Sequence, residues 1–344
     1  MKIPIVFAFD DNYALPASVA IMSLQTTKAP ATEYEVIVLH DGLRDETMRK
    51  FERICSIRWI SVSGLDFGAL PRGWSGKETW YRLVIANLLP EYDRVIWSDG
   101  DVLFKQDLAE AFAQDIGEHD WLGVCMERAD ERCGIHNHFP EAIDRAVYTP
   151  CFMVINAYRW RERDFLSKCK SVIAHYGEKL TFYDLDVLNL AADSIGDVSI
   201  KYSVFAGLIE AEHVEDASEY PWLERTHGRD AIVEAVRNPT IVHYAGCGAR
   251  LKPWERAVVN IPRDYWMYLV ESPFFIEGYF SPRLHPFFHW IVDYLQYLLT
   301  GRSTFRTRIR HWEDMIRSGR LAWLLVGFLR LRYRVNSFRR NREC

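Results

Sequence analysis

Residues 94–104 read Arg94-Val95-Ile96-Trp97-Ser98-Asp99-Gly100-Asp101-Val102-Leu103-Phe104. This apolar run has the composition of a buried strand, but two carboxylates one residue apart interrupt it. Residues two apart in an extended chain point to the same side, so Asp99 and Asp101 can converge on one point, and Gly100 lets the backbone approach a ligand closely. We therefore expect a site for magnesium, manganese or calcium. The other interpretation is a solvated turn, because Asp-Gly is a common turn dipeptide.

The sequence before this stretch alternates between apolar, strand-like runs and helical segments. The expected elements are strands at 3–9, 35–39 and 58–62, and helices at 15–24 and 45–54, the second capped by Asp45. This order predicts an α/β protein that begins with a doubly wound nucleotide-binding half. The first strand leads into Asp10-Asp11-Asn12-Tyr13, at the edge where open α/β sheets bind ligands. Neither a G-x-G-x-x-G nor a P-loop sequence occurs, so bound phosphates need another counter-charge, which a metal would supply.

Later segments also place polar residues beside apolar runs. Residues 79–88 are expected to form a helix that carries Arg82, although a buried arginine is more often an ion-pair partner than a substrate contact. Asp184-Leu185-Asp186 precedes an amphipathic helix, where acidic residues also suit the helix dipole. A last strand at 240–244 leads into a loop whose glycines and lysine could grip an anion. That loop contains His243, Gly246, Gly248 and Lys252.

Charge is distributed unevenly along the 344 residues. The net charge is -5, yet residues 302–342 hold twelve Arg and two acidic residues, a charge of +10, so the remainder carries -15. The region beyond about residue 275 is also rich in aromatic residues. We predict two domains, a catalytic body at 1–270 and a helical, basic region at 271–344 that contacts an anionic membrane surface. The alternative is a helical cap packed on the body, and the motifs of the body give no support to nucleic-acid binding.

Cysteine usage and the N-terminus favour a cytoplasmic protein. The seven cysteines are an odd number and contain no C-x-x-C pair. The first residues do not read as a signal peptide, and no apolar run reaches the ~20 residues of a membrane-spanning helix. We therefore predict peripheral association with the inner face of the cytoplasmic membrane. The stretch from Cys133 to His138 has ligand types of zinc sites but lacks a second half, which favours a loop.

Taken in order, these motifs resemble the retaining glycosyltransferases of family 8, which include bacterial lipopolysaccharide galactosyl- and glucosyltransferases. The resemblance covers residues 3–265. It rests on four motifs. Phe7 to Tyr13 match the family's opening strand and nucleotide loop, and Thr79 to Leu83 match its helix with a sugar-contacting arginine. Asp99-Gly100-Asp101 match the D-x-D motif, and His243 to Trp254 match the H-x-x-G-x-x-K-P-W ending. The family implies a GT-A fold with a mixed central sheet and a UDP-hexose donor bound with Mn²⁺ or Mg²⁺.

Carried over by position, the resemblance assigns three groups of residues. The metal ligands would be Asp99, Asp101 and His243. The donor nucleotide and its diphosphate would contact Phe7, Ala8, Asp10, Asn12, Tyr13, Asp99, Gly100, Gly246 and Lys252. The catalytic residues would be Arg82, Asp184 and Asp186, with the two acids stabilising positive charge on the donor sugar and Arg82 gripping it. The enzyme would transfer a hexose, galactose or glucose, from the donor to a glycan or glycolipid acceptor such as lipopolysaccharide.

The chain departs from the family pattern at three places. Thr149-Pro150-Cys151 stands where an Asn-Ala-Gly or Ser-Gly turn is common, and Leu185 stands where the bacterial galactosyltransferases carry Gln between two Asp. Three extra residues separate Gly246 from Lys252. Two other functions therefore stay open: a nucleotide-sugar-binding scaffold with impaired catalysis, and a phosphohydrolase that also uses D-x-D after an apolar strand.

Overall fold

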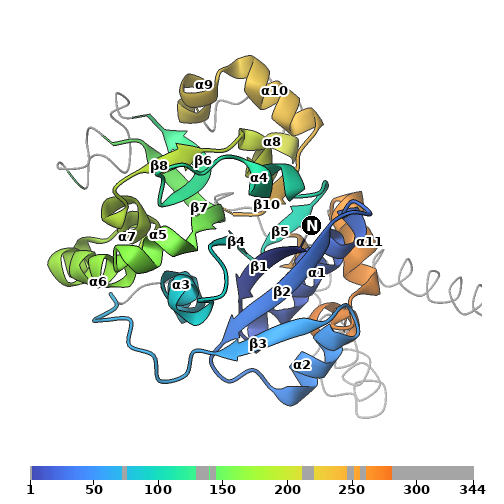
Figure 1. Cartoon of the computed structure of the whole chain (residues 1–344). Coiled ribbons are helices and arrows are strands. Elements are labelled where there is room, and N and C mark those ends of the chain that lie inside the picture. Colours follow the sequence, from blue (N-terminus) through green and yellow to red (C-terminus); the bar gives the residue numbers. More distant parts are fainter. Residues whose placement is uncertain are drawn as a thin grey trace, which may run out of the picture. The chain divides into compact units, whose positions relative to one another are not determined.

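A computed structural model of the chain describes residues 2–71, 76–128, 139, 145–210, 221–245, 252–255 and 261–280. The chain divides into two compact units, Met1–Gly248 and Ala249–Cys344. The first unit is an α/β fold built on a twisted sheet with helices beside it (Figure 1).

The first hundred residues follow the predicted alternation of strands and helices. The observed elements are β1 (Lys2–Ala8), the 3-10 turn η1 (Asp11–Tyr13), α1 (Ala14–Thr27), β2 (Glu33–His40), α2 (Asp45–Glu52) and β3 (Ile57–Ser61). The predicted cap of the second helix is wrong, because Arg44 occupies the N-cap position and makes no side-chain capping hydrogen bond. Asp45 lies instead in the first turn of α2, where its negative charge favours the positive end of the helix dipole.

The stretch around Asp99 is two strands rather than one. The chain enters it through the 3-10 helix η2 (Lys77–Val84) and the short α3 (Ile85–Leu88), which together replace the single helix predicted at 79–88. β4 (Arg94–Ser98) then belongs to a seven-stranded sheet, whereas β5 (Val102–Phe104) belongs to a separate three-stranded sheet. Asp99, Gly100 and Asp101 therefore form the junction between the two sheets.

The large sheet is mixed, as the family resemblance implied. The remaining elements of the first unit are α4 (Ala109–Ala113), β6 (Trp121–Glu127), β7 (Val147–Asn156), α5 (Ala157–Glu162), α6 (Phe165–Tyr176), η5 (Gly177–Lys179), α7 (Asp184–Ala191), β8 (Ile195–Asp197), η6 (Ile200–Tyr202), β9 (Val204–Phe205), α8 (Ala206–Glu210), α9 (Pro221–His227), α10 (Arg229–Arg237) and β10 (Ile241–His243). The strand order is β3-β2-β1-β4-β7-β6-β8. β3, β2, β1 and β4 are parallel, and β7 runs antiparallel to its neighbours β4 and β6.

Alternate residues of the central strands define the two faces of the large sheet. Val6 of β1, Val95 of β4 and Met153 of β7 contribute to one buried cluster with side chains of η2, α3, α5, α6 and α7. Phe7 points to the other face, where its ring meets the edge of Phe104 from β5 at a centroid distance of 6.3 Å. Burial on both faces explains why these strands read as continuous apolar runs.

The small sheet brings a distant part of the chain to the junction. β10 pairs antiparallel with β5 and parallel with β9. In this register His243 is the partner of Val102, and the Tyr244 N–H donates a hydrogen bond of 3.0 Å to the Asp101 carbonyl oxygen. The pairing thus places His243 beside the two aspartates, across about 140 residues of sequence.

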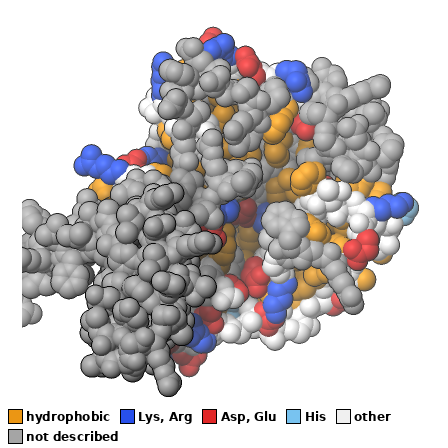
Figure 2. Space-filling model, turned by 180° about the vertical axis from the view of Figure 1, so that it is seen from behind, with side chains coloured by type: hydrophobic (Ala, Val, Ile, Leu, Met, Phe, Trp, Pro, Cys, Tyr) orange, Lys and Arg blue, Asp and Glu red, His pale blue; other side chains and the backbone are white. Residues whose placement is uncertain are grey.

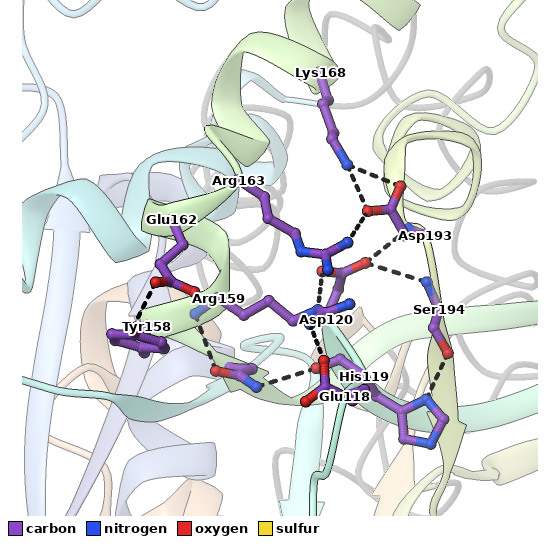
Figure 3. A network of polar contacts seen from close by, with 11 residues as sticks. Glu118, His119, Asp120, Tyr158, Arg159, Glu162, Arg163, Lys168, Asp193 and Ser194 are labelled. Atoms are coloured by element: carbon purple, nitrogen blue, oxygen red, sulfur yellow. Dashed lines mark hydrogen bonds and ion pairs between the residues drawn. The ribbon is translucent and has the colours of Figure 1, made fainter.

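A polar network fastens the far edge of the large sheet (Figure 3). Asp120, at the start of β6, is buried and accepts hydrogen bonds from the Arg159 Nε of α5 at 3.1 Å and from the Asp193 and Ser194 N–H groups before β8 at 2.7 and 3.2 Å. Glu118 pairs with the same Arg159 from a largely exposed position. Every oxygen of the buried carboxylate therefore has a donor, which makes this network a structural clamp.

The second unit contains η8 (Pro253–Glu255), α11 (Arg263–Glu271) and η10 (Phe275–Phe280). Trp266 of α11 packs edge-on against Phe275 and Tyr279 of η10. Within the described ranges, no helix is both long enough and apolar enough to cross a membrane. The predicted basic region from 281 onward and the stretch from Cys133 to His138 lie outside the described residues.

Candidate metal and donor site

Three potential metal ligands converge where the two sheets join. His243 Nε2 lies 3.5 Å from Asp101 Oδ1 and 3.9 Å from Asp99 Oδ2. One ligand atom from each of the three residues can be chosen so that all lie within 4.8 Å of one another. Each side chain is positioned by a different strand end, since Asp99 follows β4, Asp101 precedes β5 and His243 ends β10.

The chemistry of these residues suits a divalent cation. His243 is almost fully buried, and neither ring nitrogen has a partner in hydrogen-bonding geometry among the described residues. Such an arrangement is costly unless a ligand supplies the missing interaction. Two carboxylates and one imidazole, with open positions for phosphate oxygens, form a plausible first set of ligands for manganese or magnesium.

The charged groups of the cluster shift one another's pKa values. Burial and the nearby Asp101 raise the pKa of Asp99, while Arg82 and His243 oppose that rise. Burial favours neutral His243, but Cys151 and Asp101 raise its pKa well above the ordinary value of 6.5. Excess negative charge in this buried group therefore favours the uptake of a positive charge, whether a proton or a cation.

Arg82 is a buried connector between the aspartate cluster and α7. Its guanidinium donates to Asp99 Oδ1 at 2.8 Å and to the Pro150 carbonyl oxygen at 2.7 Å, and lies 3.4 Å from Asp184 Oδ2. It also stacks over the Trp97 ring at 4.4 Å, and the Trp97 Nε1–H donates to Asp99 Oδ1 at 3.0 Å. Arg82 therefore is the ion-pair partner that its burial suggested, and it fixes two of the predicted site residues at once.

The two acids of α7 have different surroundings. Asp184 begins the helix, and burial raises its pKa from 3.8 to about 6, with Arg82 acting in the opposite direction. Asp186, two residues later, has an exposed fraction of only 1 % and accepts a hydrogen bond of 2.7 Å from the Phe182 N–H. Asp184 thus lies beside Arg82, whereas Asp186 accepts this hydrogen bond from the loop before α7.

The predicted nucleotide loop lies beside the D-x-D turn. Asp10 caps η1 by accepting a hydrogen bond of 2.9 Å from the Tyr13 N–H, and it also accepts one of 2.7 Å from Asn12 Nδ2. A Cβ added at Gly100 would lie 3.5 Å from the Tyr13 ring and 3.5 Å from the Ala17 side chain. The D-x-D turn and the Asp10–Tyr13 loop are therefore packed together.

The structure says less about the other residues that were predicted to contact the donor. Phe7 has no exposed side-chain surface, so a donor contact at this position would involve its main chain, and Ala8 is partly exposed at the end of β1. Gly246 lies outside the described residues. Lys252 belongs to the second unit, where its Nζ lies 5.8 Å from the centroid of the Trp254 ring.

Sequence reasoning missed Trp97, which shapes the site. Trp97 could have been found, because it precedes Asp99 by two residues and therefore points to the same side. Cys151 had been noted only as part of the Thr149-Pro150-Cys151 departure from the family pattern, and in the structure its buried thiol lies 2.9 Å from Ser203 Oγ and its carbonyl accepts from the Asp99 N–H at 2.8 Å. A space-filling view from behind shows acidic and basic side chains beside hydrophobic ones among the described residues (Figure 2).

Comparison with known proteins identifies the family of the chain. The family model described as glycosyl transferase family 8 matches residues 4–257. The chain belongs to glycosyl transferase family 8. The family-8 region resembles GlyF, a glycosyltransferase of Streptococcus pneumoniae, with 21 % identity over 278 residues that cover 77 % of this chain and 61 % of GlyF. It also resembles a probable glycosyl transferase, Gly, of Streptococcus gordonii, with 24 % identity over 54 % of this chain and 23 % of that protein. The chain thus spans less than two thirds of these relatives.

Solved structures confirm the predicted GT-A fold of this family 8 member. The galactosyltransferase LgtC, solved with donor and acceptor sugar analogues, has a TM-score of 0.64 and 20 % identity, and the match covers 78 % of this chain and 96 % of LgtC. The bifunctional glycosyltransferase WbbM has a TM-score of 0.62 and 19 % identity, over 81 % of this chain and 51 % of WbbM. These likenesses establish the architecture of the matched part of the chain.

Proposed function

We propose that this chain is a metal-dependent, retaining hexosyltransferase that uses a UDP-sugar donor. The observation that carries the proposal is the convergence of Asp99, Asp101 and His243, from three strand ends, beside an Arg82–Asp184 ion pair. A nucleotide-sugar transferase needs a cation for the diphosphate and polar groups for the sugar within one site. Membership of glycosyl transferase family 8 supports the same conclusion.

Mn²⁺ or Mg²⁺, held by Asp99, Asp101 and His243, would stabilise the negative charge of the departing diphosphate. The chain's own residues position the donor. Asp10, Asn12 and Tyr13 offer polar and aromatic surface to the nucleotide beside Gly100, and Asp184, fixed by Arg82, can accept hydrogen bonds from sugar hydroxyls.

The residue at position 185 limits the mechanisms by which the configuration at the anomeric carbon of the sugar can be retained. Leu185, the second residue of α7, has no nucleophilic atom and is partly buried against the core. A covalent glycosyl-enzyme through this side chain is therefore chemically impossible. We favour a mechanism in which the acceptor attacks the sugar on the same face from which the diphosphate leaves. This mechanism requires no side-chain nucleophile at this position.

The donor is proposed to be UDP-galactose or UDP-glucose, and the acceptor a lipid-linked glycan such as lipopolysaccharide. We expect the purified chain with Mn²⁺ to release UDP slowly from one of these donors by hydrolysis, and EDTA to stop the release. The measurement is UDP formation across a panel of UDP-sugars, with p-nitrophenyl phosphate as a phosphohydrolase substrate. Binding of UDP without turnover of any donor would identify a scaffold, phosphate release would identify a phosphohydrolase, and either result would overturn the proposal.

The site is proposed to act at the inner face of the cytoplasmic membrane, with the Arg-rich region supplying attachment to anionic lipid. This proposal rests on the +10 charge of residues 302–342 and on the aromatic residues that accompany it. Removing residues 286–344 is expected to shift the protein from the membrane fraction to the supernatant. A truncated chain that still sediments with vesicles containing anionic lipid, at the level of the full chain, would contradict the proposal.

A further inference from the structure

The loop before α7 is closed by an acidic residue of that same helix. Asp186, the third residue of α7, accepts a hydrogen bond of 2.7 Å from the Phe182 N–H, while the Leu185 N–H donates one of 3.1 Å to the Phe182 carbonyl oxygen. Phe182 is therefore held through both its amide and its carbonyl by the first turn of the helix. Asp186 is 1 % exposed, so water does not compete for its bond to the loop.

Tyr183, between the clamped residue and the helix, has an unusual backbone conformation. Its φ is 52° and its ψ is -113°, a region that glycine adopts readily and a tyrosine does not. Its side chain is partly buried and packs against the core cluster, and its carbonyl accepts from the Val187 N–H at 3.1 Å. Strained residues of this kind persist only where the surroundings hold them in place.

The strained residue immediately precedes Asp184. The direction in which the first residue of α7 presents its carboxylate depends on the backbone angles just before it. With the observed turn, Asp184 Oδ2 lies 3.4 Å from Arg82 Nη1, although the two residues come from different elements. A relaxed φ at Tyr183 would rotate the start of α7 relative to the loop and move that carboxylate away from Arg82.

We propose that Asp186 and Tyr183 are positioning residues, which hold a strained turn so that Asp184 meets Arg82 at the donor site. The catalytic consequence rests on the proposed transferase function, whereas the turn itself does not. This assignment differs from the sequence prediction, in which the charge of Asp186 stabilises the sugar in the transition state. The two roles require different properties of the side chain. A positioning role needs a hydrogen-bond acceptor, and a charge-stabilising role needs a negative charge.

Two substitutions at position 186 separate these demands. Asp186→Asn keeps an acceptor for the Phe182 N–H and removes the charge, whereas Asp186→Ala removes both. We expect kcat/KM for the donor to fall about 10–100-fold in Asp186→Ala, through misplacement of Asp184, and only a few-fold in Asp186→Asn. A fall in Asp186→Asn as large as that in Asp186→Ala would overturn the positioning role.

Thermal unfolding tests the strained turn without any need for turnover. Tyr183→Gly and Tyr183→Ala both lose the ring, so their difference reports on the backbone. At a position with ordinary φ the glycine variant is the less stable, but here we expect its Tm to exceed that of Tyr183→Ala by about 2–4 °C. We also expect Asp186→Ala to melt below Asp186→Asn. An alanine variant at 183 at least as stable as the glycine variant would overturn the inference, whereas absence of donor turnover in the unmodified chain would overturn the proposed function alone.

Discussion

Replacing Asp101 by Ala is expected to abolish manganese-dependent binding of UDP and to lower donor turnover at least about 10²-fold. The substitution removes one of two carboxylates that face His243 Nε2, leaving one carboxylate and a buried imidazole to hold a divalent cation. Calorimetric titration of UDP with and without Mn²⁺ measures the first effect, and UDP release from the preferred donor measures the second.

The fold of the Asp101→Ala variant should be preserved. Asp101 contributes to the pairing of β5 and β10 through its carbonyl oxygen, which accepts from the Tyr244 N–H regardless of the side chain. The matched control is Asp230→Ala, which removes an exposed carboxylate from the first turn of α10 in the same unit. The control should bind UDP and turn over donor like the unmodified chain. If Asp101→Ala binds UDP with unchanged dependence on Mn²⁺, the metal assignment is wrong.

The sequence predicted the large sheet well because its strands are long and covered on both faces. β1, β2 and β4 each appear as an apolar run that ends in polar residues, and the resulting edge carries the nucleotide loop and the D-x-D turn. The small sheet was predicted only in part. The strand expected at 240–244 contains β10, but β5 and β10 have three residues each and β9 has two, too few for their pairing into a separate sheet to be recognised in the sequence.

The candidate site also has a part that local sequence predicts and a part that depends on distant contacts. The convergence of Asp99 and Asp101 follows from local geometry, but His243 was reached only through a family resemblance, because its position depends on the pairing of β10 with β5. The separate surroundings of Asp184 and Asp186 were also unpredictable. Two acids in one helical turn look equivalent in sequence, whereas a contact distant in sequence holds Asp184 near Arg82 and a local hydrogen bond joins Asp186 to the Phe182 N–H.

Replacing Arg82 by Ala is expected to remove donor turnover and to lower the free energy of unfolding by about 3–5 kcal/mol. Arg82 is 2 % exposed, and its guanidinium connects Asp99, Asp184 and the Pro150 carbonyl oxygen, so its loss leaves buried negative charge without its main partner. Urea unfolding measures the stability change. Arg128→Ala is the matched control, because its pair with Asp197 is exposed and should contribute only about 0–1 kcal/mol.

The pH dependence of this loss identifies its cause. The pKa of Asp184 is raised from 3.8 to about 6 in the folded protein, so the stability from its bound proton is complete below pH 3.8 and is lost as the pH rises through 6. Arg82 limits that rise, so its removal should raise the pKa of Asp184 further. At pH 5 Asp184 is largely protonated with or without Arg82, whereas at pH 8 the unmodified protein pairs an ionised carboxylate that the variant cannot pair. The Arg82→Ala deficit should therefore be larger at pH 8 than at pH 5, and an equal deficit at the two pH values would show that the loss of stability does not come from the charge pair between Arg82 and Asp184.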